Sequence, residues 1–384
     1  MNTKYVQRVD KQSGPSLDDF IYEKSISLNN GIKNSYNNYI FYNSSLSTSE
    51  FVPRTEFKYD RNIAWYTPEM ARGMVNINNK RKAVDCVLEV RDARAPLSSA
   101  NPSILNHYPN NTNKLVILNK ADLTPKHSLQ RSRELLESVG NKVILINSLS
   151  LKKIIKIKRF VTSNVSVKFP TLGFWLLVVG LPNVGKSSLI RALKHHSFKE
   201  QWYSKRELLE HEKMKRTKPR VENRAGTTKL LDFFNISLNP KIFCFDTPGI
   251  MLPKMDDVEI NLKLAALGCL NDSVAGEDYI ADYILYRLNK SNLYTYVKTL
   301  NLSSPTNNIN KISQHIGEMI EKKWNSVDPV NCYKIFINQF RMGFFGKICL
   351  DDLSNVIQLN QLNDFLLSEP PSQYTTSFDI IHGL

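Results

Sequence analysis

Residues 173–196 read GFWLLVVGLPNVGKSSLIRALKHH, and this segment gives the strongest indication of the fold. The apolar run FWLLVV predicts a buried strand, the segment SLIRALKHH predicts a helix, and GLPNVGKS between them matches the pattern GxxxxGK[ST]. Backbone N–H groups of such a loop and of the following helix N-terminus bind phosphate, because they are unpaired donors at the positive end of the helix dipole. The stretch therefore predicts a P-loop that binds a nucleotide.

The loop supplies the first candidate site residues. We expect the ammonium group of Lys186 to contact the β- and γ-phosphates and the hydroxyl of Ser187 to bind Mg2+. Asn183 either holds a monovalent cation such as K+ against the phosphates, as a catalytic group beside Lys186, or only braces the loop. The expected nucleotide-binding residues of the loop are Pro182, Asn183, Val184, Gly185, Lys186, Ser187 and Ser188.

A second phosphate-side motif follows later in the chain. Residues 246–249 read DTPG directly after the apolar run KIFCF, where a P-loop enzyme carries a carboxylate for Mg2+. We expect Asp246 to bind Mg2+ and the amide of Gly249 to contact the γ-phosphate as a catalytic group. In the intervening segment NRAGTTK, Thr228 is the candidate for a catalytic hydroxyl that closes over the metal, although threonine is also common in ordinary loops.

Residues 119–122 read NKAD at the end of the apolar run KLVIL, the place where open α/β sheets present ligand contacts. A carboxylate at Asp122 can accept hydrogen bonds from both N1–H and the exocyclic amine of guanine, and adenine offers no such pair of donors. Asn119, Lys120 and Asp122 therefore predict that the nucleotide is GTP. Ordinary GTPases carry the guanine motif after the phosphate loop, whereas Lys120 precedes Lys186 here, so the order predicts a circularly permuted domain.

Apolar runs alternate with helical segments between residues 61 and 262, which predicts an α/β P-loop GTPase domain around a buried parallel sheet. The expected strands lie in the runs 84–90, 114–120, 141–147, 173–180 and 241–249. Residues 263–384 show helical spacing without comparable runs and predict a smaller helical domain. Residues 1–60, which begin with a stretch rich in Asn and Ser, predict a poorly ordered tail.

The residue after the DTPG motif bears on the rate of hydrolysis. Ras-like enzymes orient the attacking water with a glutamine after the glycine of this motif, but Ile250 occupies that position here. An apolar side chain cannot hydrogen-bond a water molecule. We therefore expect slow hydrolysis by the protein alone.

The formal net charge is +15, and most of the excess lies in residues 151–220, which hold 17 Lys and Arg against 4 Glu. Such a concentration fits a polyanion such as RNA, since phosphate contacts supply affinity independent of sequence, but it also fits a solvated surface. No run approaches the roughly 18 apolar residues that a membrane span needs, so we expect no transmembrane segment. Candidate RNA contacts are Lys152, Lys153, Lys156, Arg216 and Arg220.

With these motifs in this order, the chain resembles the circularly permuted GTPases of the YlqF type, and in particular their mitochondrial ribosome-associated branch. The segments WYTPEMARG from Trp65, EVRDARAPLSSANP from Glu89 and INQFRMGFFGKICLDDL from Ile337 are similar to the opening helix, first strand and closing segment of that family. Ser148, within INSLS, stands at the place of the family's base-contacting loop. The letters TPE replace the family's usual PGH, so no role of that histidine carries over to this chain.

The resemblance implies a GTP- and Mg2+-dependent enzyme, favoured by K+, that binds the large ribosomal subunit and its rRNA late in assembly, with hydrolysis stimulated by the ribosome. It also implies a mitochondrial protein, in the matrix or peripheral on the inner membrane. Acidic residues in the N-terminal tail, such as Asp18 and Asp19, are unusual in a transit peptide, so a nucleolar or cytosolic relative stays open. A regulatory switch that acts on a protein effector is the alternative function.

Overall fold

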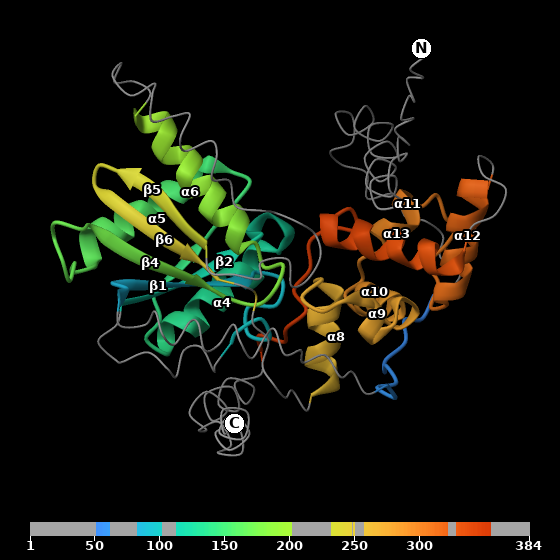
Figure 1. The fold of residues 1–384 in the computed structure, drawn as a ribbon. Helices are drawn as coiled ribbons and strands as arrows, with labels where there is room; N and C mark the ends of the chain where they lie inside the picture. The colour runs from blue at the N-terminus through green and yellow to red at the C-terminus, as the bar shows by residue number, and fades with distance from the viewer. Residues whose placement is uncertain are drawn as a thin grey trace, which may run out of the picture.

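The computed structural model describes residues 51–61, 83–101, 113–201, 232–247, 249, 257–321 and 328–354. These residues form an α/β domain around a sheet and a helical domain, which lie side by side in Figure 1. The predictions made for the segment from Trp65, for Arg216 and Arg220, for Thr228 and for Ile250 lie outside the described residues.

The sheet of the α/β domain has, within the described chain, six strands in the order β3-β2-β1-β4-β6-β5. β1, β2, β3, β4 and β6 run parallel, and β5 pairs antiparallel with β6 at one edge. The predicted α/β fold is confirmed. The strands are β1 (Cys86–Asp92), β2 (Asn113–Asn119), β3 (Val143–Leu145), β4 (Phe174–Val179), β5 (Asp232–Leu238) and β6 (Lys241–Asp246).

The edge strand β5 is the strand that the sequence analysis missed. Its sequence DFFNISL lacks a continuous apolar run, because polar residues alternate with the buried Phe234 and Ile236. An antiparallel edge strand needs only one apolar side, and Phe233 on the other side is 50% exposed. The alternation of apolar and polar residues therefore indicates β5, whereas continuous apolar runs indicate the parallel strands.

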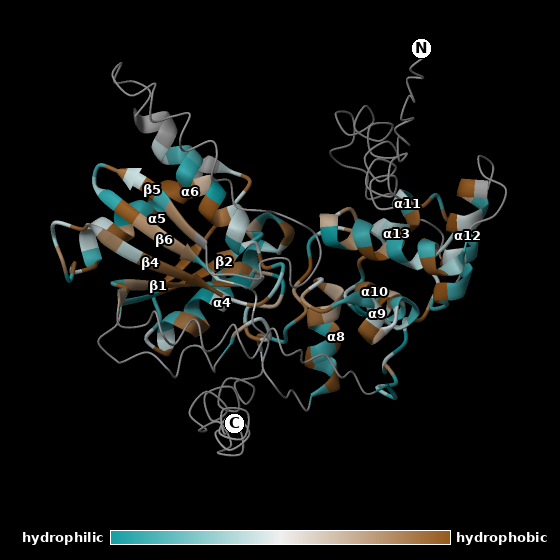
Figure 2. Ribbon diagram, in the orientation of Figure 1, coloured by the Kyte–Doolittle hydropathy of each residue, from teal (hydrophilic) through white to brown (hydrophobic). Residues whose placement is uncertain are grey.

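Helices cover both faces of the sheet, because alternate residues of a strand point to opposite sides. In β2, Leu115 and Ile117 belong to the large core formed with α5 and α6, whereas Val116 and Leu118 pack with α4. Figure 2 shows the hydrophobic (brown) residues along the strands between these helices. The helices of this domain are η2 (Ala121–Leu123), α4 (Lys126–Ser138), α5 (Leu151–Asn164) and α6 (Lys186–Gln201).

The permuted motif order leaves the ligand edge of the sheet intact. β4, which precedes the P-loop, lies between β1 and β6, although the chain enters the sheet at β1. The parallel strands β1, β2, β4 and β6 have their carboxyl ends at the same edge, so loops separated in sequence meet there.

The helical domain is built around α10, whose Tyr283, Ile284 and Leu285 are fully buried. α10 packs against α13, α8 and α12. Asp257 and Asp328 cap α8 and α13, because their side chains accept hydrogen bonds from the first amides of each helix. None of the described helices has the length and apolar character to cross a membrane. The helices are α8 (Val258–Ala266), α9 (Asp272–Ala275), α10 (Glu277–Lys290), α11 (Thr295–Thr299), α12 (Ile309–Glu321) and α13 (Pro329–Met342).

Residues 51–61 pack on the helical domain, so residues 51–60 differ from the predicted poorly ordered tail. Arg54 forms a two-pronged ion pair with Asp282 of α10, with N–O distances of 2.8 and 2.9 Å. Phe57 lies among tyrosine rings at centroid distances of 5.4 to 5.5 Å. Arg54 and Asp282 lie 228 residues apart, and three of the four rings belong to α10, so local composition carries no signal of these contacts. The rings are those of Tyr59, Tyr279, Tyr283 and Tyr286.

We expect Phe57→Ala to lower the free energy of unfolding by about 3 kcal/mol, because it removes a buried aromatic side chain and leaves a cavity. Urea unfolding followed by circular dichroism measures the change. Val52→Ala is the matched control, since Val52 lies on the same segment and is 71% exposed. It should change the stability by less than about 0.5 kcal/mol. Equal effects of the two substitutions would contradict the docking of this segment.

The segment after α13 returns to the α/β domain. The amide of Leu350 donates to the carbonyl of Arg94 at 2.7 Å. The carboxylate of Asp351 accepts hydrogen bonds from the amides of Leu97 and Ser98 at 2.7 and 3.0 Å. The segment after α13 is thus held to the loop after β1 by one backbone hydrogen bond and by the carboxylate of Asp351.

Candidate nucleotide-binding site

The P-loop joins β4 to α6, and Lys186 is the first residue of that helix. Its ammonium group donates to the carbonyl of Leu181 at 2.9 Å, and the side chain is buried. Burial lowers the pKa of Lys186 to about 8, although the nearby carboxylate of Asp246 opposes this shift. An ammonium group that burial destabilises is strongly stabilised by an anionic ligand. The site of Lys186 therefore suits a nucleotide phosphate.

Asn119 connects the P-loop to both base-side loops. Its side-chain amide donates to the carbonyl of Val184 at 2.9 Å, and its side-chain oxygen accepts from the amide of Ser148 at 3.0 Å. Gly185 has a φ of +100°, and a Cβ there would collide with the Asn119 amide. One buried side chain therefore fixes the relative positions of three loops that are far apart in sequence, and position 185 requires glycine.

Ser187, in the first turn of α6, lies beside Asp246, the last residue of β6. The Ser187 Oγ donates to the Asp246 Oδ2 at 2.8 Å. A hydroxyl and a carboxylate oxygen this close form a donor set that suits Mg2+, which would sit on these two residues and neutralise phosphate charge. Gly249 lies against the P-loop, since a Cβ there would come within 2.5 Å of the Pro182 Cα. The DTPG loop therefore reaches the phosphate side of the site.

The guanine motif lies beside the P-loop. Lys120 has a left-handed backbone with a φ of 57°, and its ammonium group donates to the carbonyl of Asn183 at 2.9 Å. Asp122 lies in η2 at the carboxyl end of β2, and its side chain is exposed. An exposed carboxylate at this edge is accessible to the base of a nucleotide whose phosphates occupy the P-loop.

The candidate nucleotide-site residues that the structure describes all lie at the carboxyl edge of the sheet, at the ends of β2 and β6 or in the segments that follow β2, β3, β4 and β6. Thr228 lies outside the described residues. The candidates placed at this edge are Asn119, Lys120, Asp122, Ser148, Pro182, Asn183, Val184, Gly185, Lys186, Ser187, Ser188, Asp246 and Gly249.

The sequence analysis missed Asp92 and Arg94, which complete the polar surroundings of Lys120. The Asp92 carboxylate is fully buried and pairs with the Lys120 ammonium at 2.9 Å and the Arg94 guanidinium at 2.8 Å. Burial alone would raise the pKa of Asp92, but these two cations outweigh it and hold the pKa well below its usual range. Three charged residues in RDAR, directly at the end of a buried strand on the ligand edge, were an available signal.

Comparison with known proteins identifies the family. The family described as 50S ribosome-binding GTPase matches residues 176–328. The mitochondrial ribosome-associated GTPase 1 of Ictalurus punctatus is 32% identical over 323 residues, which cover 78% of this chain and 96% of the relative. The chain belongs to the mitochondrial GTPase 1 family. A second member, the mitochondrial GTPase 1 of Aedes aegypti, is 30% identical and covers 76% of this chain and 94% of its own.

A solved structure gives a further match. GNP-bound YlqF from T. maritima is 19% identical, with a TM-score of 0.46, and the alignment covers 74% of this chain and 99% of the YlqF chain.

Membership of the mitochondrial GTPase 1 family confirms the predicted activity, which is binding and hydrolysis of GTP. It also confirms the predicted mitochondrial localisation, since relatives in an insect, a fish and a plant carry that description. The matched relatives align over about three quarters of the chain.

Proposed function

We propose that this GTPase binds the large subunit of the mitochondrial ribosome in its GTP state during subunit assembly and uses hydrolysis to leave. The names of its relatives, which describe ribosome-associated enzymes, support the partner. The observation that carries the proposal is a basic face on α5, next to the nucleotide site.

The basic face consists of Lys153, Lys156 and Arg159, which are all exposed. Their spacing of three residues places them along one side of the helix, while Ile154 and Ile157 between them are fully buried. α5 begins three residues after Ser148, so a polyanion on this face lies near the base-side loop. Phosphate groups of rRNA are the matching ligand, because several cations along a helix bind a nucleic acid backbone without reading its sequence.

Within the site, we assign Asn119, Lys120 and Asp122 to the guanine base, with Ser148 beside it. Lys186 and the Gly249 amide contact the β- and γ-phosphates, and Ser187 and Asp246 hold Mg2+. Thr228 stays a prediction for the hydroxyl that closes over the metal. The closing of the phosphate loop around a triphosphate, and its release after hydrolysis, would give the two states of the enzyme.

We further assign a K+ site to Asn183. Its side-chain nitrogen donates to the carbonyl of Gly268 at 2.7 Å, which fixes the amide so that its oxygen is the acceptor. An amide oxygen in the phosphate loop can hold a monovalent cation against the phosphates, where its charge stabilises the transition state. This role would compensate for the apolar residue Ile250.

We expect the triple substitution Lys153→Glu, Lys156→Glu and Arg159→Glu to abolish binding to large mitochondrial subunits and stimulation of GTP hydrolysis by them. Hydrolysis without subunits should stay within about twofold, because α5 does not contribute to the phosphate cradle. Co-sedimentation over a range of KCl concentrations and single-turnover GTPase assays measure both. The slope of log affinity against log salt should fall by about 2, since roughly 0.7 counterions are released per phosphate contact.

The matched control is Lys298→Glu, Lys311→Glu and Lys347→Glu, which changes the net charge equally on exposed residues of the helical domain. It should retain most of the subunit binding. Equal losses in the two triple variants would show that net charge, rather than this face, sets the affinity. Absence of any stimulation by subunits in the unaltered protein would favour a switch that acts on a protein effector.

A further inference from the structure

The P-loop residue Asn183 is held from both domains. Its carbonyl accepts from the Lys120 ammonium at 2.9 Å, and its side-chain amide donates to the carbonyl of Gly268 at 2.7 Å. Gly268 is the left-handed residue, with a φ of +78°, that follows the end of α8 in the helical domain. Asn183 itself has a φ of 56°, a conformation that tertiary contacts must maintain.

Arg341 of α13 holds the end of α8 in place. Its guanidinium donates to the carbonyls of Ala265 and Ala266 at 2.7 and 3.1 Å. It also forms a two-pronged ion pair with Asp272, at the start of α9, with distances of 2.6 and 2.9 Å. A guanidinium group is planar and carries several N–H donors, so it can hydrogen-bond the carbonyls at a helix end and a carboxylate at the same time. The turn that carries Gly268 is therefore positioned by Arg341.

The backbone of Arg341 closes a circuit back to the guanine motif. Its carbonyl accepts from the Arg94 guanidinium at 3.2 Å. Arg94 binds Asp92 through three donors at 2.8 to 3.0 Å, and Asp92 pairs with Lys120 at 2.9 Å. We call this circuit the polar ring; its members are Asn183, Gly268, Arg341, Arg94, Asp92 and Lys120.

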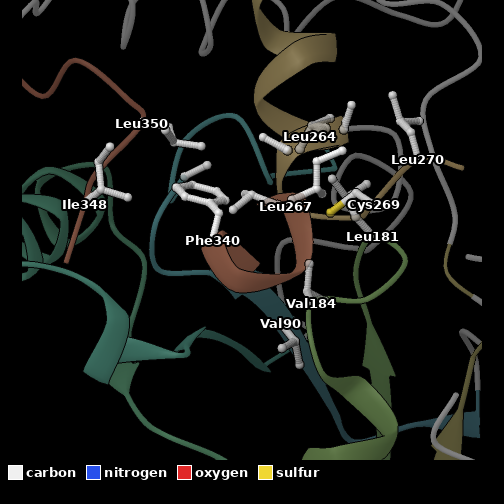
Figure 3. Close-up of a cluster of buried hydrophobic side chains, with 14 of the residues drawn as sticks. Val90, Leu181, Val184, Leu264, Leu267, Cys269, Leu270, Phe340, Ile348 and Leu350 are labelled. Carbon is white, nitrogen blue, oxygen red and sulfur yellow. The ribbon is translucent and has the colours of Figure 1, made fainter. Parts of the chain in front are cut away.

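Apolar packing surrounds the polar ring. Figure 3 shows Leu181 and Val184 of the P-loop in one cluster with Leu267 and Cys269, which follow α8, and with Phe340 of α13. Because packed interiors have few voids and deform little, a displacement of α8 or α13 must move the P-loop contact as well. The low dielectric also strengthens the ion pairs of the ring and makes a broken one costly.

We propose that Arg341 and Arg94 are positioning residues for the P-loop, and that through them the helical domain controls the orientation of the Asn183 amide and of the Lys120 ammonium. A partner that moves α8 and α13 would thereby change the rate of GTP hydrolysis without touching the nucleotide. The inference rests on the proposed nucleotide and K+ roles of these two residues and extends them to the helical domain.

The test compares steady-state GTP hydrolysis by the full chain in KCl and in NaCl. Arg341→Ala should lower kcat in KCl about tenfold or more, since misplacement of a catalytic group by about 1 Å has effects of that order. In Arg341→Ala, the ratio of the hydrolysis rate in KCl to that in NaCl should fall to the ratio that Asn183→Ala shows. Arg54→Ala is the matched control, because it removes a two-pronged ion pair of the helical domain away from the site. It should leave kcat and the ratio unchanged.

A double-substitution cycle separates positioning from general loss of structure. If Arg341 acts through Asn183, the double variant Arg341→Ala with Asn183→Ala should be no slower than Asn183→Ala alone. Additive effects on kcat would overturn the inference, as would a loss of thermal stability in Arg341→Ala with an unchanged kcat and ion ratio.

Two further variants cover a failure to fold. Arg341→Lys keeps a cation for Asp272 but loses the fork, and Arg94→Lys keeps a cation for Asp92 but loses the donor to the Arg341 carbonyl. Both should show the same fall in the ion ratio, and a wild-type ratio in both would overturn the inference. If Asn183→Ala keeps the preference for K+ over Na+, the assignment of the K+ site to Asn183 fails. The kcat values of the double-substitution cycle still test whether Arg341 positions Asn183.

Discussion

Lys186→Ala should lower kcat/KM for GTP by about 10³-fold, because it removes the buried ammonium group that we assign to the phosphates. Loss of a single charged or polar group that stabilises developing charge in an enclosed site typically costs 10²- to 10³-fold. The unaltered side chain has its ammonium on the carbonyl of Leu181 at 2.9 Å, at the mouth of the P-loop. Binding of a fluorescent GTP analogue measures the loss of nucleotide affinity, and single-turnover hydrolysis measures the loss in the rate of the chemical step.

The matched control is Lys194→Ala in the same helix. Lys194 is also buried, burial also lowers its pKa, and its ammonium lies 6.0 Å from the centroid of the Phe234 ring, away from the P-loop. We expect it to affect stability and not GTP turnover. A similar loss of turnover in both variants would mean that Lys186 acts through the packing of α6.

The pH dependence of nucleotide binding provides a second check on Lys186. In the unliganded protein this side chain has a pKa of about 8, so it is increasingly neutral above that pH. A bound phosphate favours the ammonium form and raises the pKa, so binding above pH 8 requires uptake of a proton. The dissociation constant for GTP should therefore rise about tenfold per pH unit above pH 8 in the unaltered protein. The Lys186→Ala variant should lack this dependence.

Asp122→Asn should change the nucleotide preference from GTP to XTP. In our assignment the carboxylate accepts from the two guanine donors, N1–H and the exocyclic amine. Xanthine carries a carbonyl in place of that amine. The side chain of asparagine offers one N–H donor and one oxygen acceptor, which match the carbonyl and the N1–H of xanthine. With guanine, the N–H donor of asparagine would face the exocyclic amine, which is also a donor. The ratio of kcat/KM for GTP over XTP should fall by about 10⁴-fold, because unpaired polar groups in a binding site discriminate on that scale.

Competition of GTP and XTP for the fluorescent analogue, followed by hydrolysis of each, measures the change in preference. Asp352→Asn is the control, since this aspartate is exposed and lies beyond α13 in the returning segment. It should retain the preference for GTP. Loss of GTP binding by Asp122→Asn without a gain for XTP would assign Asp122 to the loop structure rather than to base recognition.

The chemistry of the nucleotide site can be predicted from three short motifs. GLPNVGKS, DTPG and NKAD each follow an apolar run, and parallel strands end at a common edge, so the three motifs predict one site even in permuted order. The structure places Ser187 on Asp246 and Asn119 on Val184 accordingly. Such motifs can be recognised in a sequence because the residues of each one belong to a single loop. Residues that are close in the sequence of a loop are also close in space.

The connection between the two domains is visible only in the folded structure. Residues 51–61 are ordered by an aromatic cluster and an ion pair on α10, and the polar ring joins Arg94 to Arg341 across the domain boundary. Arg54 and Asp282 are 228 residues apart, and Arg94 and Arg341 are 247 residues apart, so no local pattern reports these pairings. Arg94 is buried, and burial strengthens the interactions of its guanidinium group; burial is a property of the packed fold that a single stretch of sequence does not contain.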